Sequence, residues 1–72
     1  MSDAERERER LLAAWPDEFR DGVNCGYSRR FEGEREAGGY PRGFHGWSLD
    51  RRNSWFAGYN FGRNERLREA TE

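Results

Sequence analysis

The sequence predicts an all-α fold in which two helices cross at glycine-rich faces and are joined by a Gly/Pro loop, with a charged helix before them. Three observations lead to this prediction. The pattern aromatic-x-x-Gly-x-Asn-x-Gly at residues 19–26 recurs at residues 55–62. Apolar residues flank both copies at helical spacing, and no segment shows the sustained apolar alternation of a half-buried strand. The chain therefore contains two copies of one short helical unit.

The two glycine pairs of this repeat, Gly22 with Gly26 and Gly58 with Gly62, are costly in a helix. Each interior glycine is less favourable than alanine by roughly 0.8–1 kcal/mol, so a compensating gain is needed. Glycines at i and i+4 lie one above the other on one helix face, where the missing Cβ lets another backbone approach closely. We expect the glycine faces to meet at a helix crossing, with larger side chains around it: Phe19, Val23, Trp55 and Tyr59. The alternative is that these glycines are turn residues and both segments are loops.

The first helix is predicted over residues 3–14. Ser2 and Glu5 have the spacing of a capping box, in which the serine hydroxyl accepts from the backbone N–H of the glutamate. Glutamate and arginine alternate along the helix, which places opposite charges at i+3 but like charges at i+4, so these pairs partly cancel. We expect residues 1–15 to form a solvated, loosely docked or frayed helix beside the main domain at residues 16–72. Its apolar patch is small: Leu11, Leu12 and Trp15.

The second helix carries the first repeat copy. Pro16 suits its first turn, because the N–H that proline lacks would have no partner there. The helix should extend to about residues 30–31. Residues 32–46 contain five glycines and Pro41, which predicts the connecting loop.

The third helix carries the second copy. Ser48 is a good N-cap, and Asp50 in the first turn complements the positive end of the helix dipole. Arg66 and Arg68 are favourable near the negative end, so we expect this helix to end at about Arg68.

Size and composition limit what this chain can be. Its 72 residues make one domain near the lower limit for a self-sufficient core. Cys25 is the only cysteine and His45 the only histidine, so neither a disulfide framework nor a structural zinc site is available. Stability must come from burial of the eleven aromatic residues or from association, which leaves homodimerisation open. With no apolar run of membrane-spanning length and a lone thiol, we expect a cytoplasmic location and no membrane partner.

The charges are unevenly placed although the net charge is only −1. Residues 1–18 and 64–72 are net acidic, whereas residues 19–63 are net basic. All thirteen basic residues are arginine. Arginine makes bidentate and stacked contacts to phosphates and bases that lysine does not, but a GC-rich genome that favours arginine codons also explains such a bias.

The chain resembles the ribosome modulation factor family over about residues 19–62. The resemblance is carried by the segments Phe19-x-x-Gly22-x-x-x-Gly26, Tyr40-Pro41 and Leu49-Asp50-Arg51-Arg52-Asn53-Ser54-Trp55-Phe56-Ala57-Gly58-Tyr59. Members of that family are small bacterial proteins with two helices joined by a loop, which bind the small ribosomal subunit in starved cells and promote inactive ribosome dimers. The resemblance implies a structural signature of Gly22, Gly26, Trp55 and Gly58. It also implies that Arg51 and Arg52 belong to an RNA-facing surface.

Aromatic and basic residues alternate from the connecting loop into the first turn of the third helix. Such a surface can stack unpaired bases and neutralise phosphates. The candidate surface comprises Tyr40, Arg42, Phe44, His45, Trp47, Arg51 and Arg52, with Arg29 and Arg30 from the end of the second helix. The alternative is that Phe44 and Trp47 are core residues and that the arginines pair with Glu32, Glu34 and Glu36. We favour a core role for the two aromatics and a binding role for Arg51 and Arg52.

Catalysis is not expected. Cys25 and His45 could form a nucleophile and its base, but Cys25 occupies the repeat position of Phe61, which indicates packing. No third orienting residue suggests itself, and no cofactor is expected. Asn24 and Asn60 recur at equivalent positions, where they either hydrogen-bond across the helix pair or face solvent.

Two functional hypotheses follow. The first is a non-enzymatic binding protein similar to ribosome modulation factor, which contacts rRNA or the ribosome and modulates translation. The second is a protein-interaction module, such as a phage-encoded inhibitor of a host protein, and the near-neutral charge and acidic first helix favour it. Exposed aromatics such as Phe44 or Trp47 would then be the anchors.

Overall fold

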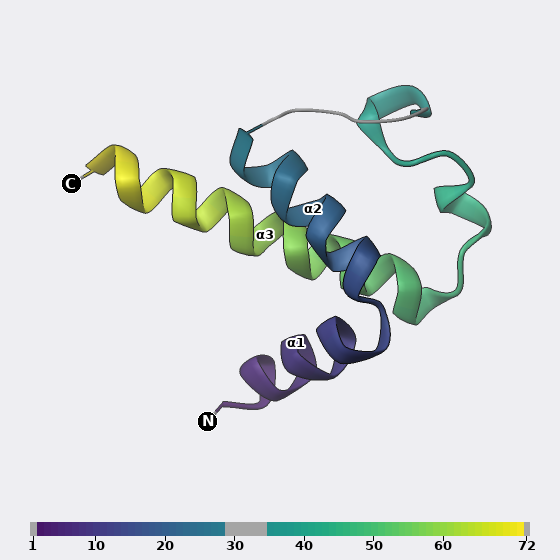
Figure 1. Ribbon diagram of the computed structural model, residues 1–72, viewed down its shortest axis with the longest axis horizontal. Coiled ribbons are helices and arrows are strands. Elements are labelled where there is room, and N and C mark those ends of the chain that lie inside the picture. The colour runs from purple at the N-terminus through teal and green to yellow at the C-terminus, as the bar shows by residue number, and fades with distance from the viewer. Residues whose placement is uncertain (1, 29–34, 72) are drawn as a thin grey trace.

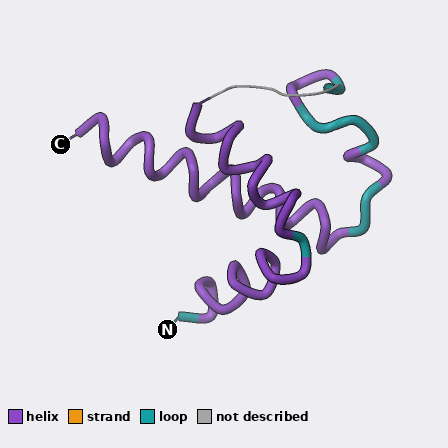
Figure 2. Tube along the Cα trace, viewed as in Figure 1, coloured by secondary structure: helices purple, strands orange, loops and turns teal. Residues whose placement is uncertain are grey.

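A computed structural model describes residues 2–28 and 35–71 and contains three α-helices in this part of the chain (Figure 1). These are α1 (Asp3–Ala14), α2 (Pro16–Ser28) and α3 (Leu49–Thr71). Two short 3₁₀ turns, η1 (Ala37–Gly39) and η2 (Phe44–Gly46), lie between α2 and α3. Figure 2 shows helices and connecting loops and no strand in the described ranges. The predicted all-α fold is confirmed.

The helix boundaries follow local signals. The bounds of α1 are those predicted, and the Glu5 N–H donates to the Ser2 hydroxyl at 3.2 Å. At the start of α3, the Arg51 N–H donates to the Ser48 hydroxyl at 3.3 Å, as an N-cap requires. Among the ends that can be compared, only that of α3 differs from expectation. The expected end of the second helix at residues 30–31 lies outside the described residues, and α3 runs past Arg68 to Thr71.

The crossing of α2 and α3 brings backbone against backbone at the repeated glycines. A Cβ placed on Gly22 would lie 2.1 Å from the Trp55 carbonyl oxygen, and one on Gly58 would lie 2.1 Å from the Phe19 carbonyl oxygen. Both distances are far inside van der Waals contact. Only a residue without a side chain fits at either position, so the predicted close approach at the first glycine of each pair is confirmed.

The second glycine of each pair makes the same contact one turn further on. A Cβ on Gly26 would lie 2.1 Å from the Tyr59 carbonyl oxygen, and one on Gly62 would lie 2.3 Å from the Val23 carbonyl oxygen. The contacts are thus reciprocal, because each copy of the motif meets the residues that are equivalent to its own in the other copy. This gives the helix pair an approximate internal two-fold symmetry. Backbone contacts this close also suit weak Cα–H···O interactions, which add to the packing.

The symmetry fixes the direction of the two helices. As the residue number rises along α2, the contacted residues of α3 rise as well, so the helices cross while running in the same general direction (Figure 1). Two such helices cannot be joined by a tight turn, because the chain must return to the starting end. The long connection between α2 and α3 is therefore a geometric requirement of the glycine crossing.

The connecting segment folds over the first half of α3. Residues Gly38 and Gly39 adopt φ values of 87° and 84°, a left-handed conformation that glycine accepts without strain. A single antiparallel bridge joins Arg35 to Pro41 on either side of this turn. The segment thereby delivers its aromatic side chains to the helix pair.

An aromatic core forms between this segment, α2 and α3. Phe44 is 2% exposed, and its ring centroid lies 5.5 Å from Trp55 and 4.8 Å from Tyr40. The core role predicted for Phe44 is confirmed, and that for Trp47 in part, since its side chain is only partly buried. The cluster consists of buried Cys25, Phe44 and Trp55 with partly buried Tyr40, Trp47 and Tyr59.

Helix α1 docks on α3 through its last turn. Leu11 is buried. The fully buried Ser54 hydroxyl of α3 lies 3.2 Å from the Leu11 carbonyl oxygen and 3.0 Å from the Trp15 carbonyl oxygen, to which it donates. It thereby ties α3 to the junction of α1 and α2, where these two carbonyl oxygens also accept the backbone N–H groups of Trp15 and Phe19, respectively.

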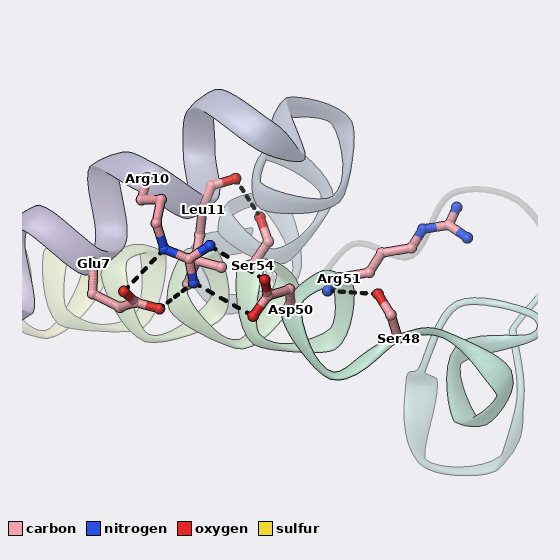
Figure 3. Close-up of polar contacts among 7 residues, drawn as sticks. All are labelled: Glu7, Arg10, Leu11, Ser48, Asp50, Arg51 and Ser54. Carbon is pink, nitrogen blue, oxygen red and sulfur yellow. Dashed lines mark hydrogen bonds and ion pairs between the residues drawn. The ribbon is translucent and has the colours of Figure 1, made fainter.

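An exposed ion-pair cluster adds to this contact (Figure 3). The Arg10 guanidinium lies between two carboxylates, 2.6 Å from Glu7 in its own helix and 3.2 Å from Asp50 in α3. Exposed pairs of this kind contribute little to stability, so the buried Leu11 and Ser54 are the principal attachment. That α1 is loosely docked stays a prediction.

Replacing Ser54 with alanine should loosen α1 without disturbing the glycine crossing. The variant loses a buried donor while its volume hardly changes, which should cost about 1–2 kcal/mol. Amide exchange measured by NMR should become faster in α1 than in α2. The matched control is Ser28→Ala, which removes an exposed hydroxyl that donates to the Asn24 carbonyl oxygen. Unchanged exchange in α1 of the Ser54 variant would show that this hydroxyl does not hold the helix.

Candidate functional site

The candidate surface lies on the connecting segment and the first turn of α3, and Glu36 organises it. The Glu36 N–H donates to the Tyr40 carbonyl oxygen at 2.7 Å. Its side-chain Oε1 accepts from the Gly43 N–H at 3.1 Å, while Oε2 lies 3.6 Å from Nε2 of His45. The imidazole of His45 is exposed at the surface.

Arg51 is held in place by aromatic rings. Its guanidinium carbon lies 4.0 Å from the centre of the Trp47 ring and 5.9 Å from that of Trp15, which is cation–π geometry. Its Nε is also 3.6 Å from a carboxylate oxygen of Glu18 in α2. Arg51 therefore joins both tryptophans to α2, a structural role that the sequence did not indicate.

Arg42 and Arg52 are placed differently from Arg51. Arg42 is exposed in the connecting segment, and Arg52 is half-buried in the first turn of α3. The Nε of Arg52 is buried with no hydrogen-bond partner, and no carboxylate of residues 2–28 or 35–71 lies within ion-pair distance of its guanidinium. The charge of Arg52 is thus the least compensated of the predicted set that the structure describes. Arg29 and Arg30 lie outside the described residues.

Asp21, the centre of a partly buried hydrogen-bond network, was not predicted from the sequence. Its carboxylate accepts two hydrogen bonds from the Arg35 guanidinium, at 2.8 and 2.7 Å, and one from the Trp55 indole N–H at 2.7 Å. The Arg35 hydrogen bonds lower the pKa of Asp21, although burial opposes them. This network joins α2, α3 and the connecting segment. Of its members, Trp55 stands within the repeat motif and Asp21 directly before a motif glycine, whereas Arg35 lies near no recognisable sequence signal.

Cys25 is a packing residue. Its side chain is 1% exposed within the aromatic core, and burial raises the pKa of the thiol. The thiol is therefore protonated at neutral pH, which removes the thiolate that nucleophilic attack requires. His45, by contrast, is at the surface. Among the described residues, no group of three or more His, Cys, Asp or Glu side chains is placed to hold a metal ion.

The repeated asparagines face solvent. Asn24 and Asn60 are both exposed, which decides between the two roles that the sequence left open. Asn60 borders a hollow in the aromatic surface, whereas its counterpart Asn24 does not. The two-fold symmetry of the crossing therefore does not extend to the outer surface.

These observations define the class of protein by its fold: a small all-α domain built on a parallel crossing of two glycine-faced helices. In the ranges that the structure describes, no helix has the length and apolar character needed to cross a bilayer. No protein-family model matches the chain, and comparisons with curated proteins and with solved structures gave no match.

Proposed function

We propose that this chain is a non-enzymatic binding protein, similar to ribosome modulation factor, which contacts rRNA or the ribosome and modulates translation. The observation that carries the proposal is the position of Arg52. Arg52 stands in the first turn of α3, the helix that carries the second copy of the repeat motif. Its guanidinium has no carboxylate partner among the described residues. An uncompensated arginine is what an RNA phosphate would neutralise.

Neighbouring groups support the same proposal. Arg42 and His45 are exposed on the connecting segment that packs against α3. Arg51 contributes less, because its guanidinium already stacks on Trp47 and lies near Glu18. The basic residues Arg42, His45 and Arg52 are therefore the best candidates for phosphate contacts, and Arg51 joins Trp47 to α2.

The alternative, a protein-interaction module, is favoured by one specific feature. Leu49 and Leu67 of α3 are 65% and 50% exposed, respectively, more than the other large apolar side chains singled out in the described residues. A protein partner could bury such side chains, whereas RNA gains little from them. Binding measurements on charge-reversed variants distinguish the two functions.

The double variant Arg42→Glu/Arg52→Glu should bind ribosomes or small-subunit RNA at least about tenfold more weakly than the wild type at low salt. The affinity of this variant should also depend less on salt concentration, because the variant neutralises fewer phosphates. The measurement is co-sedimentation with ribosomes and fluorescence anisotropy with labelled RNA, each over a salt series.

The matched control is Arg20→Glu/Arg68→Glu, which changes the net charge equally. Both control arginines are exposed and already pair with a carboxylate one turn away, Arg20 with Asp17 and Arg68 with Glu65. The two double variants should therefore differ in RNA binding. The RNA proposal fails if the wild-type protein does not bind ribosomes at low salt, and nuclease-resistant capture of one host protein would favour the alternative.

A further inference from the structure

An aromatic groove opens on the side of α3 that faces the turn of the connecting segment. It has a volume of about 290 Å³, and neither Arg42 nor His45 lines it. Phe56 is 39% exposed at its edge, and Asn60 is exposed one turn further along α3. The groove is lined by Gly38, Tyr40, Trp55, Phe56, Tyr59 and Asn60.

Two stacked pairs of rings, with one further ring across them, form the groove. Buried Phe44 supports the lining from behind. The Trp55 and Tyr59 rings are stacked at 5.5 Å between centroids, and Tyr40 is stacked on Phe44 at 4.8 Å. Phe56 meets Tyr40 edge-on at 6.2 Å. Because these rings are packed against one another, the groove is already formed before any ligand binds.

An arginine stands one helical turn beyond each end of the stretch of α3 that lines the groove. Arg52 is one helical turn before Phe56, and Arg63 is one turn after Tyr59, so both fall on the face of α3 that lines the groove. They are separated by about 16 Å along the helix axis. No described carboxylate lies within ion-pair distance of either guanidinium.

The acidic residues of α3 fall outside this face. Asp50 pairs with Arg10 of α1, and Glu65 pairs with Arg68. Glu69 accepts a hydrogen bond from the Tyr27 hydroxyl of α2. At about 100° per residue, all three acidic positions project away from the arc that contains Phe56 and Asn60. The charged α3 side chains beside the aromatic groove are therefore basic, whereas acidic and basic side chains are mixed on the opposite side of the helix.

We propose that this groove holds one unpaired base of single-stranded RNA, with Arg52 and Arg63 neutralising phosphates on either side. Aromatic faces stack on any base, and flanking arginines follow the backbone, which is how single strands are commonly bound. The Asn60 amide supplies both a donor and an acceptor for a base edge. A closed cavity of about 150 Å³ holds benzene, so this larger open groove has room for a base.

This inference deepens the proposed RNA-binding function and rests on it. It adds a site that is separate from Arg42 and His45, and it assigns Arg63, Phe56 and Asn60 a direct contact with RNA. It also specifies the form of the RNA, because a base within a duplex cannot enter the groove without unstacking.

The test measures binding of a fluorescein-labelled ten-nucleotide oligouridylate and of an RNA duplex of equal length by anisotropy. Ribosome co-sedimentation is measured on the same samples. The groove variants are Phe56→Ala and Arg63→Glu. The matched controls are Phe61→Ala and Arg68→Glu, because Phe61 is 38% exposed and both control residues project to the other side of α3. Thermal melting by circular dichroism verifies that each variant is folded.

Phe56→Ala should weaken binding of the single strand roughly five- to hundredfold, the range that loss of one base–aromatic stack produces. Phe61→Ala should change the affinity for the single strand by less than about twofold. Arg63→Glu should weaken binding and reduce its salt dependence, whereas Arg68→Glu should change both much less.

Other outcomes overturn the inference and separate it from the proposed function. Equal effects of Phe56→Ala and Phe61→Ala, or duplex binding as tight as single-strand binding, would show that no base enters the groove. If ribosomes are bound but the oligonucleotide is not, the groove inference falls and the proposed function stands. If neither is bound, both fall.

Discussion

Replacing Gly58 with alanine should lower the thermal unfolding midpoint by roughly 10 °C or more, or prevent α2 and α3 from packing at all. The added Cβ would lie 2.1 Å from the Phe19 carbonyl oxygen and 3.1 Å from the Val23 backbone nitrogen. These are backbone atoms, so no side chain can rotate away and the two helices must separate. Overpacking usually costs about 1–3 kcal/mol and more where the backbone must move, and each kcal/mol shifts the midpoint of such a small domain by about 4–8 °C.

The direction of this effect distinguishes close packing from helix propensity. Alanine is the better helix former by roughly 0.8–1 kcal/mol, so a glycine that met nothing would be stabilised by the same substitution. Gly46→Ala is the matched control, because a Cβ at Gly46 has nothing within 4 Å. Circular dichroism melting compares the two variants. A Gly58→Ala protein as stable as the wild type would refute the backbone contact and, with it, the structural basis of the family resemblance.

Replacing Asp21 with alanine should cost about 3 kcal/mol of unfolding free energy. The substitution leaves the Arg35 guanidinium, whose side chain is 13% exposed, without its bidentate partner, and it leaves the Trp55 indole N–H without an acceptor. Breaking a buried pair from one side typically costs about 3–5 kcal/mol, and Asp21 lies at the lower end because it retains some exposure. Urea unfolding followed by tryptophan fluorescence measures the loss.

Asp17→Ala is the matched control for this prediction. Asp17 also pairs with an arginine, Arg20, but the two side chains are 81% and 73% exposed. Exposed pairs contribute only about 0–1 kcal/mol, so the control should unfold almost like the wild type. Similar losses in the two variants would mean that the Asp21 network has no special role.

The same carboxylate makes stability depend on pH in a defined direction. The pKa of Asp21 is lower in the folded protein than its ordinary value, chiefly because of the Arg35 hydrogen bonds. Its contribution is therefore complete above the unfolded-state pKa of about 3.9 and is lost as the pH falls through the lower folded value. The difference in stability between the wild type and Asp21→Asn should accordingly shrink between pH 5 and pH 2, which urea unfolding at several pH values measures.

The candidate site was only partly predictable. Arg51 and Arg52 are neighbours in a basic pair, and nothing in the order of residues distinguishes their roles. In the structure, Arg51 stacks on Trp47 while Arg52 has no carboxylate partner among the described residues. Arg63 was not singled out at all, because its place at one end of the aromatic groove depends on which face of α3 the connecting segment leaves open.

Local patterns in the order of residues were enough to predict the helices and the face on which two of them meet. The caps at Ser2 and Ser48 act on neighbours within one turn, and each glycine pair is recognised by its i, i+4 spacing, so both are visible in the order of residues. The tertiary structure alone decided the parallel direction of the crossing, the Asp21 network and the groove beside Phe56. These depend on atoms far apart in the chain, and contacts of that kind are set by how the helices and the connecting segment pack in space.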